Sequence, residues 1–202
     1  MSALNPQADR EWRTTLAGQS YLISTSQSKL SLPFINEAFS SPEMSWATEL
    51  PVEALKLMLQ NSYTLGVYTH SSRTMTDGPD ELGVPAPASI SEPSSPRTPS
   101  PTLEATTTET QMAEMVGMAR FVTDYVSIAY LTDVYVAPGH RGRGISSWMI
   151  ECCEEFIDSL PALRRVLLMA ERDKEGFYRR VMGAKEVQEE GKGLVCLTRK
   201  RR

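Results

Sequence analysis

The stretch VYVAPGHRGRGIS, residues 134–146, decides how the rest of this 202-residue chain is organised. Its apolar start runs into a turn with three glycines and two arginines, and an amphipathic segment begins at Ile145. Glycine lets the backbone approach a ligand closely, and the first turn of a helix carries free N–H groups and a partial positive charge. With Arg141 and Arg143 beside them, these groups indicate a strand, turn and helix that bind a phosphate or pyrophosphate. A purely structural turn would look much the same, and the spacing matches neither a Walker loop nor a GxGxxG turn.

Outward from this stretch, the chain alternates between strand-like and helix-like segments. The hydrophobic pattern predicts strands at residues 21–24, 63–68, 115–122, 128–136, 165–170, 185–188 and 194–199, and helices at residues 32–39, 51–60, 145–157 and 174–182. The nearly continuous apolar run at 165–170 is typical of a strand buried on both faces. In the second helix, Val52, Leu55 and Leu59 fall on one face. This order of elements predicts an α+β (mixed α/β) sheet with a right-handed crossover.

One segment, residues 71–111, differs from the rest in composition. It holds seven of the thirteen prolines, is dense in Ser and Thr, and its few apolar residues follow no period. Such a stretch cannot bury enough surface to offset its ordering entropy, so we expect a disordered insert that replaces a hairpin turn. The chain is then a single domain, 1–202, interrupted by this insert, which loop-closure entropy allows. Ser95, Thr98 and Ser100 each precede a proline, so the insert is either a target of proline-directed phosphorylation or an ordinary linker.

Composition excludes several classes of protein. The formal net charge of −4 argues against a nucleic-acid-binding protein. The three cysteines, Cys152, Cys153 and Cys196, are too few for a disulfide framework and indicate reduced thiols. With two histidines and no HExxH or CxxC pattern, no metal site is expected. We find no apolar leader and no window long enough to span a membrane, so we expect a cytoplasmic protein, with the nucleus as the alternative.

Two motifs carry a resemblance to a known family. Residues 141–146 (RGRGIS), preceded by residues 134–138 (VYVAP), resemble motif A of the GNAT acetyltransferases, (Gln/Arg)-x-x-Gly-x-(Gly/Ala), with Ser146 at the last position. Residues 171–178 (ERDKEGFY), followed by Met182-Gly183, resemble motif B, although Ala184 stands where the family usually has Phe. Trp46-Ala47 and residues 66–68 (GVY) are similar to a small single-domain branch whose substrate is not known.

The resemblance implies a fold and a cosubstrate. It implies a central mixed, twisted sheet of six to seven strands, flanked by about four helices, in which two parallel strands splay apart at an acetyl-CoA site. The pyrophosphate would lie on the backbone amides of Arg141, Gly142, Arg143, Gly144, Ile145 and Ser146. The pantetheine arm would pair with Val134 and Val136, and Asp173 would help to position it. A backbone amide near Val136 would polarise the thioester carbonyl.

The resemblance also implies catalytic roles. Tyr178 would protonate the leaving thiolate, although without the family it reads as an ordinary aromatic on a helix face. Asp133 and Glu171 are the candidates for the general base that a neutral amine acceptor requires, and either could equally be a solvated carboxylate. Trp46 either lines the acceptor pocket or staples two helices.

The expected function is an acetyl-CoA-dependent N-acetyltransferase that acts by direct attack in a ternary complex. The acceptor would be the primary amine of a small molecule, and the acidic balance suits a cationic one. Two alternatives stay open: acetylation of a protein N-terminus or lysine, with the insert recruiting the protein, and a non-catalytic acyl-CoA-binding module, which Ser146 and Ala184 keep possible. No nucleic acid, membrane or metal is expected as a partner, and the protein would be a monomer or a homodimer.

Overall fold

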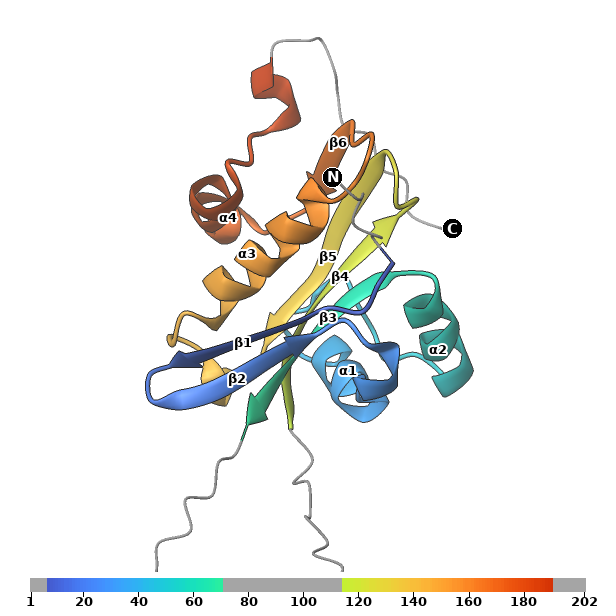
Figure 1. The fold of residues 1–202 in the computed structure, drawn as a ribbon, viewed down its shortest axis with the longest axis vertical. Coiled ribbons are helices and arrows are strands. Elements are labelled where there is room, and N and C mark those ends of the chain that lie inside the picture. The colour runs from blue at the N-terminus through green and yellow to red at the C-terminus, as the bar shows by residue number, and fades with distance from the viewer. Residues whose placement is uncertain (1–6, 71–113, 191–202) are drawn as a thin grey trace, which may run out of the picture. The chain divides into compact units, whose positions relative to one another are not determined.

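Six strands form one mixed sheet in the computed structural model, which describes residues 7–70 and 114–190 (Figure 1). The strands lie side by side in chain order: β1 (Glu11–Leu16), β2 (Gln19–Ser24), β3 (Tyr63–His70), β4 (Met115–Thr123), β5 (Ile128–Val136) and β6 (Arg165–Leu168). Neighbours are antiparallel from β1 to β5, and β6 runs parallel to β5. With the four α-helices of the described residues, this arrangement confirms the predicted fold class.

The strand β1 was not expected from the sequence. It pairs with β2 through a two-residue turn in which Ala17 (φ 49°) and Gly18 (φ 77°) are both left-handed. Such turns match the natural twist of two antiparallel strands. β1 alternates between exposed and half-buried residues and has no fully buried side chain, as an edge strand should, so its apolar pattern is weak.

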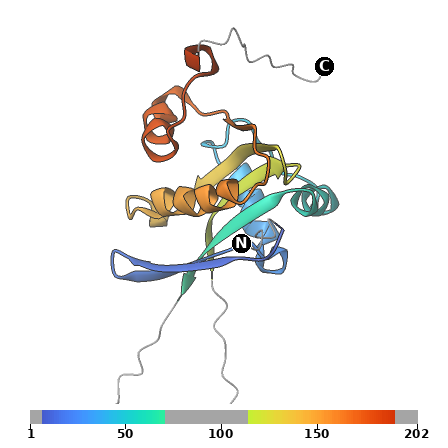
Figure 2. The same cartoon turned by 45° about the horizontal axis from the view of Figure 1, so that its top comes forward.

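Helices cover both faces of the sheet (Figures 1 and 2). α3 (Ile145–Asp158) packs on one face, where Phe121, Met149 and Phe156 are among the fully buried side chains. α1 (Leu32–Phe39) and α2 (Val52–Gln60) pack on the other, around a separate apolar cluster. No helix among these described elements is both long and apolar enough to cross a membrane.

The two helices on the second face begin close to where the sequence predicts. The Ser31 hydroxyl accepts a hydrogen bond from the Phe34 N–H at 3.3 Å and caps α1. In α2, Leu55 and Leu59 are buried as expected. Val52 lies on the same helix face but is 52% exposed. It is the first helical residue and lies outside the apolar cluster that the later turns reach.

β3 and β4 are antiparallel neighbours, and the Thr69 N–H donates to the Glu114 carbonyl at 2.9 Å where the two strands meet. The segment between them therefore joins two adjacent strands. The insert expected at residues 71–111, with its three candidate phosphorylation sites, lies outside the described residues, as does the strand expected at 194–199.

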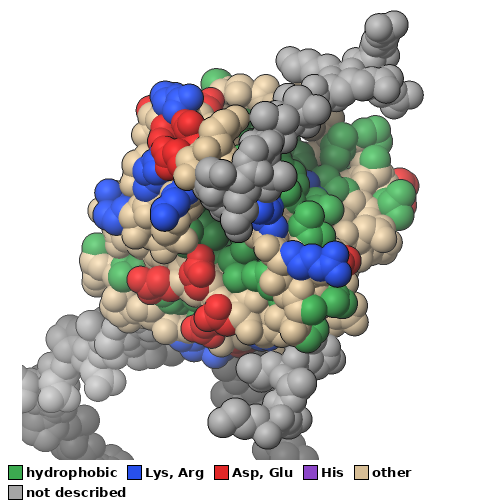
Figure 3. All heavy atoms as spheres, turned by 90° about the horizontal axis from the view of Figure 1, so that it is seen from above, with side chains coloured by type: hydrophobic (Ala, Val, Ile, Leu, Met, Phe, Trp, Pro, Cys, Tyr) green, Lys and Arg blue, Asp and Glu red, His purple; other side chains and the backbone are tan. Residues whose placement is uncertain are grey.

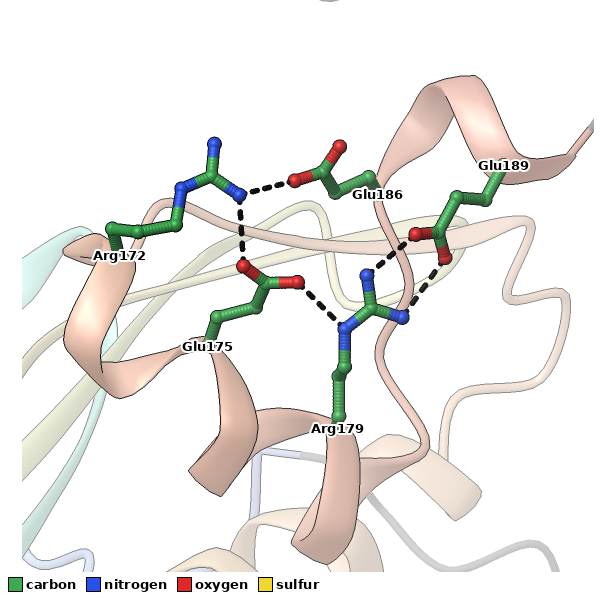
Figure 4. Close-up of polar contacts among 5 residues, drawn as sticks. All are labelled: Arg172, Glu175, Arg179, Glu186 and Glu189. Carbon is green, nitrogen blue, oxygen red and sulfur yellow. Dashed lines mark hydrogen bonds and ion pairs between the residues drawn. The ribbon is translucent and has the colours of Figure 1, made fainter.

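The C-terminal elements differ in part from the prediction. α4 (Glu175–Met182) ends at Gly183, whose φ of 64° is the left-handed conformation expected of a helix-ending glycine. A 3-10 turn, η4 (Val187–Glu190), replaces the strand expected at 185–188. Figure 4 shows that Glu186, within this segment, binds Arg172, and that Glu189, just after it, binds Arg179.

Candidate active site

β5 and β6 stop pairing partway along their length. Their register runs from Ile128 opposite Arg165 to Leu131 opposite Leu168, and β5 then continues to Val136 without β6. The strand expected at 165–170 is therefore two residues shorter, and it is half-buried rather than buried on both faces, because β5 is its one partner among the described residues. β5 therefore runs five residues past the end of β6, at the place where the resemblance implies that the two parallel strands splay apart.

A cavity of about 590 Å³ opens at this splay. Its walls come from β5, the end of β6, the start of α3, α4, and residues 43–46 between α1 and α2, which we name the strap. Figure 3 views the domain from this end, where hydrophobic side chains show in a hollow beside intermixed acidic and basic ones. Eight of the predicted site residues line the cavity: Trp46, Asp133, Val134, Val136, Arg141, Ser146, Glu171 and Tyr178.

A β-bulge in β5 shapes the cavity wall. Asp133 has a φ of 52°, and the register with β4 shifts between Met118 and Arg120. A bulge bends its strand and redirects side chains. Side chains therefore do not alternate strictly along residues 128–136: Ile128 is exposed, whereas Val136, which strict alternation would place on the same side, is buried.

The turn after β5 has room for a ligand against its backbone. Gly142 (φ 72°) and Gly144 (φ 88°) are left-handed, a conformation that favours glycine. A side-chain carbon added at either glycine would meet no atom within 4 Å. Gly144 is the N-cap of α3 and supplies no side-chain cap, so the first N–H groups of this 14-residue helix remain available to an anion. These residues fit a pyrophosphate.

Both arginines of the turn already have protein partners. The Arg141 Nε donates to the Val136 carbonyl at 2.7 Å, and its two terminal nitrogens bind both carboxylate oxygens of Glu43. This pair raises the pKa of Arg141 and lowers that of Glu43. Arg143 donates to the Tyr21 hydroxyl at 3.3 Å and the Gly139 carbonyl at 3.1 Å. The two positive charges are thus less available to an anion than the sequence suggests.

Tyr178 lies on α4 with its side chain in the cavity wall. Burial raises the pKa of Tyr178 to about 12, and a nearby buried thiol, Cys153, adds to the shift. The hydroxyl is therefore protonated near neutral pH. Phe177 packs edge-on against the Tyr178 ring, with the ring centres 5.1 Å apart. The structure gives Tyr178 the protonation state that a proton donor needs.

Asp133 is buried, and both of its carboxylate oxygens accept hydrogen bonds. Its Oδ2 accepts from the Arg120 Nε at 2.6 Å, and its Oδ1 accepts from the Thr132 hydroxyl at 3.0 Å and the Trp46 indole N–H at 3.3 Å. Arg120 is itself largely buried. A buried ion pair of this kind loses much stability if one partner is removed.

Glu171 follows β6 and is exposed. It accepts a hydrogen bond from the Ser45 hydroxyl at 3.4 Å. Asp173, by contrast, points to solvent, lies 2.5 Å from the Lys174 ammonium and does not line the cavity. The structure therefore brings Glu171 to the cavity but not Asp173.

Four other predicted cofactor residues, Gly142, Arg143, Gly144 and Ile145, do not line the cavity either. Ile145 is buried as the first residue of α3, and the other three belong to the turn beside the cavity. This placement suits contact with a ligand that extends out of the cavity across the turn.

Apart from Trp46, the strap was missed in the sequence. Three of its four residues bond to β5 or to the segments that follow β5 and β6: Glu43 to Arg141, Ser45 to Glu171, and Trp46 to Asp133. The fourth, Met44, is fully buried. No local pattern marks the strap, since its partners lie 98, 126 and 87 residues away. Within residues 7–70 and 114–190, no three His, Cys, Asp or Glu side chains gather as metal ligands would.

Comparisons with known proteins agree with this geometry. The sequence model of the acetyltransferase (GNAT) family matches residues 95–184. A Gibberella zeae protein, provisionally named an acetyltransferase, is 34% identical over 169 residues, which cover 84% of this chain and 81% of that protein. The crystal structure of a GNAT-family protein of Xanthomonas campestris pv. campestris, provisionally an acetyltransferase, aligns with a TM-score of 0.55 at 22% identity, over 88% of this chain and 93% of that one. The predicted family is thereby confirmed, and the chain belongs to the GNAT family of acetyltransferases.

Proposed function

We propose that the protein transfers an acetyl group from acetyl-CoA to the primary amine of a small molecule, by direct attack in a ternary complex. The observation that carries this proposal is the cavity at the point where β6 ends and β5 continues, since Tyr178 and Glu171 both line it. The open backbone of the turn continues from the same cavity. Residues 132–136, free of β6, can offer backbone hydrogen bonds to the amide groups of a pantetheine arm.

The residues divide the chemistry between them. The amine nitrogen forms a bond to the thioester carbonyl carbon as the carbon–sulfur bond breaks. Tyr178 donates its hydroxyl proton to the departing sulfur. Burial, which raises the pKa of Tyr178 to about 12, keeps this hydroxyl protonated before the transfer. Glu171 accepts the proton that the amine loses, directly or through a water molecule. We assign this role to Glu171 and not to Asp133, because both oxygens of Asp133 already accept hydrogen bonds.

Thermal unfolding with ligands tests the cosubstrate. A ligand at 100 times its Kd stabilises the folded state by about 2.7 kcal/mol, a rise in Tm of roughly 5–10 °C for a domain of this size. We expect this rise with acetyl-CoA and desulfo-CoA and not with ATP, which lacks the pantetheine arm. An unchanged Tm with millimolar acetyl-CoA would contradict the proposal. An equal rise in Tm with ATP would show that the turn binds phosphate groups in general and does not select CoA.

A pair of glycine variants makes the test specific to the turn. Gly142→Ala and Gly18→Ala both place a side chain on a left-handed residue with open space around it, so both should lower the Tm of the empty protein. Only Gly142 lies in the turn after β5, whereas Gly18 joins β1 to β2. We expect Gly142→Ala to lose most of the acetyl-CoA shift and Gly18→Ala to keep it.

A further inference from the structure

We propose that the acceptor is a monoamine with an apolar, preferably aromatic, body, and not a polyamine or another polycation. The inference rests on the proposed function, because it names the substrate class of the same site. It comes from the charges and rings that line the acceptor side of the cavity, and from the buried ion pair that holds one of those rings.

The described cavity wall offers a single carboxylate that is not in an ion pair. Of the three acidic residues that line it, Glu43 is bound by Arg141 and Asp133 by Arg120. Glu171 is left, with a hydrogen bond from Ser45.

The lysine of the same wall does not change this count. Lys174 is bonded to Asp173 at 2.5 Å, and Asp173 is the main cause of the raised pKa of Lys174, with lesser contributions from Glu171 and Glu43. One ammonium group can therefore meet Glu171, and a second would find no free carboxylate in the described wall.

Around Glu171 the wall is apolar and partly open. Trp46 is 52% exposed and Met169 is 67% exposed, both high values for large apolar side chains. Both line the cavity, as does the half-buried ring of Tyr130. The strap contacts both Glu171 and β5, since Ser45 donates to Glu171 and the next residue, Trp46, donates to Asp133. An amine at Glu171 would carry its body against these side chains.

The indole of Trp46 is held in place by the interior of the protein. Its N–H donates to Asp133, and Asp133 is fixed by the 2.6 Å ion pair with Arg120. Asp133 also adopts a left-handed backbone conformation, which is costly for a residue other than glycine. Because neither oxygen of Asp133 is free to act as a base, the bulge and the ion pair are explained by a positioning role: they present a fixed ring to the acceptor.

This arrangement discriminates between amines. A flat apolar body gains contact with Trp46, and aromatic rings gain most. A second ammonium group inside the cavity would be desolvated without a partner, which costs about a factor of ten or more in binding. The net negative charge of the whole chain does not change this preference for a monoamine. The choice between amines depends on the side chains of the cavity wall, which the acceptor contacts directly.

Release of free CoA from acetyl-CoA, measured with three acceptor amines, tests the inference. The amines are ethylamine, phenethylamine and spermidine, which share a primary amine and differ in body and charge. We expect phenethylamine to exceed spermidine in kcat/KM by about tenfold or more.

Variants of Trp46 test the role of the indole. Trp46→Ala should raise the KM for phenethylamine by about tenfold and change the KM for ethylamine little. Trp46→Phe should restore most of the loss. The control Leu57→Ala removes another exposed apolar side chain, 62% exposed on α2 and outside the cavity, and should change neither amine.

The outcomes separate this inference from the function on which it rests. Equal or better turnover of spermidine would overturn the monoamine assignment and leave the acetyltransferase intact. An equal loss for ethylamine and phenethylamine in Trp46→Ala would show that the indole only supports the strap, and would also overturn it. Failure to acetylate any of the three amines, in a protein that binds acetyl-CoA, would overturn the proposed N-acetyltransferase itself and the inference with it.

Discussion

The hydroxyl of Tyr178 stands in the cavity wall with its pKa raised to about 12 by burial. If it protonates the leaving sulfur, Tyr178→Phe removes the donor while keeping the ring. We expect kcat to fall by about 10²- to 10⁴-fold, the usual contribution of a general acid, and the KM for acetyl-CoA to change little. Steady-state kinetics at neutral pH measure both constants.

Tyr125→Phe is the matched control for this variant. Tyr125 is also half-buried and also has a pKa raised by burial, but it packs on Tyr63 and Phe156, away from the cavity. It should leave kcat unchanged. If Tyr178→Phe also retains full kcat, the sulfur receives its proton from another source and the acid role of Tyr178 is wrong.

Single residues were predictable where the signal was local. Gly142 and Gly144 follow from their place between a strand and a helix, and Tyr178 follows from a motif within one turn of α4. The partners of the site were not predictable. Glu43 reaches Arg141 across 98 residues of sequence, and nothing in the spacing of either indicates that the two charges cancel.

At the scale of elements, α4 is fastened to its neighbours by a network of five charged side chains (Figure 4). Glu175 accepts from Arg172 at 2.8 Å and from Arg179 at 2.7 Å, and these two arginines bind Glu186 and Glu189 beyond the helix. The network joins the start of α4, its middle and the η4 turn. It therefore sets the orientation of the helix that carries Tyr178.

Replacing Arg179, the arginine of this network that lies within α4, should lower the stability of the protein in a salt-dependent way. We expect Arg179→Gln to lower the Tm at low ionic strength, and the difference to shrink in 1 M salt, where the Debye length falls to about 3 Å. The neighbouring Arg180 faces the Phe177 ring instead of the network, at 5.9 Å from the ring centre, so Arg180→Gln is the control. An Arg179→Gln effect that is the same at both salt concentrations would show that packing, not charge, holds the helix.

Elements were predictable in proportion to their apolar content. β5 and α1 have the bounds that their hydrophobic periods indicate. β1 was missed because it buries no side chain completely. The strand expected at 185–188 is wrong: η4 begins at Val187, and Glu186 binds Arg172, a partner that no local pattern indicates. The fold class could still be predicted from the order of the elements, because a chain in which strands and helices alternate can form only a few types of sheet.

For the whole molecule, the pKa shifts of the ionisable groups predict that the free energy of unfolding is highest over a middle range of pH. Carboxyl pKa values are lowered by partners in the folded state at Glu11, Glu43, Asp124, Asp173, Glu175 and Glu189, and raised by burial at Glu154. At the six carboxyl groups with a lowered pKa, the unfolded chain binds protons more readily than the folded chain. They outnumber Glu154, which has the opposite effect, so stability should fall as the pH drops through the ordinary values of 4.5 for Glu and 3.8 for Asp.

At high pH, stability is limited by groups whose pKa is raised, not lowered, in the folded state. Burial raises the pKa of Tyr63, Cys152 and Tyr178 to about 12 each, from ordinary values of 10.0 for Tyr and 9.0 for Cys. The unfolded chain releases these protons first, so stability should fall as the pH rises above 9 and toward 12. Urea unfolding at a series of pH values should give the highest free energy of unfolding between about pH 5 and pH 9. A maximum below pH 4 would contradict the assignment of the lowered carboxyl groups.

The splay of β5 from β6 leaves a strand edge inside the domain. Beyond Leu131, the β6 side of β5 has no ladder partner in the described part of the chain. A free edge of this kind ordinarily invites strands of other chains, and proteins shield such edges with loops or helices. Here the strap lies over the gap, fastened to Arg141, Asp133 and Glu171. The contacts that form the site therefore also lie beside this edge, and we expect a variant that loses them to be more prone to pair with strands of other chains.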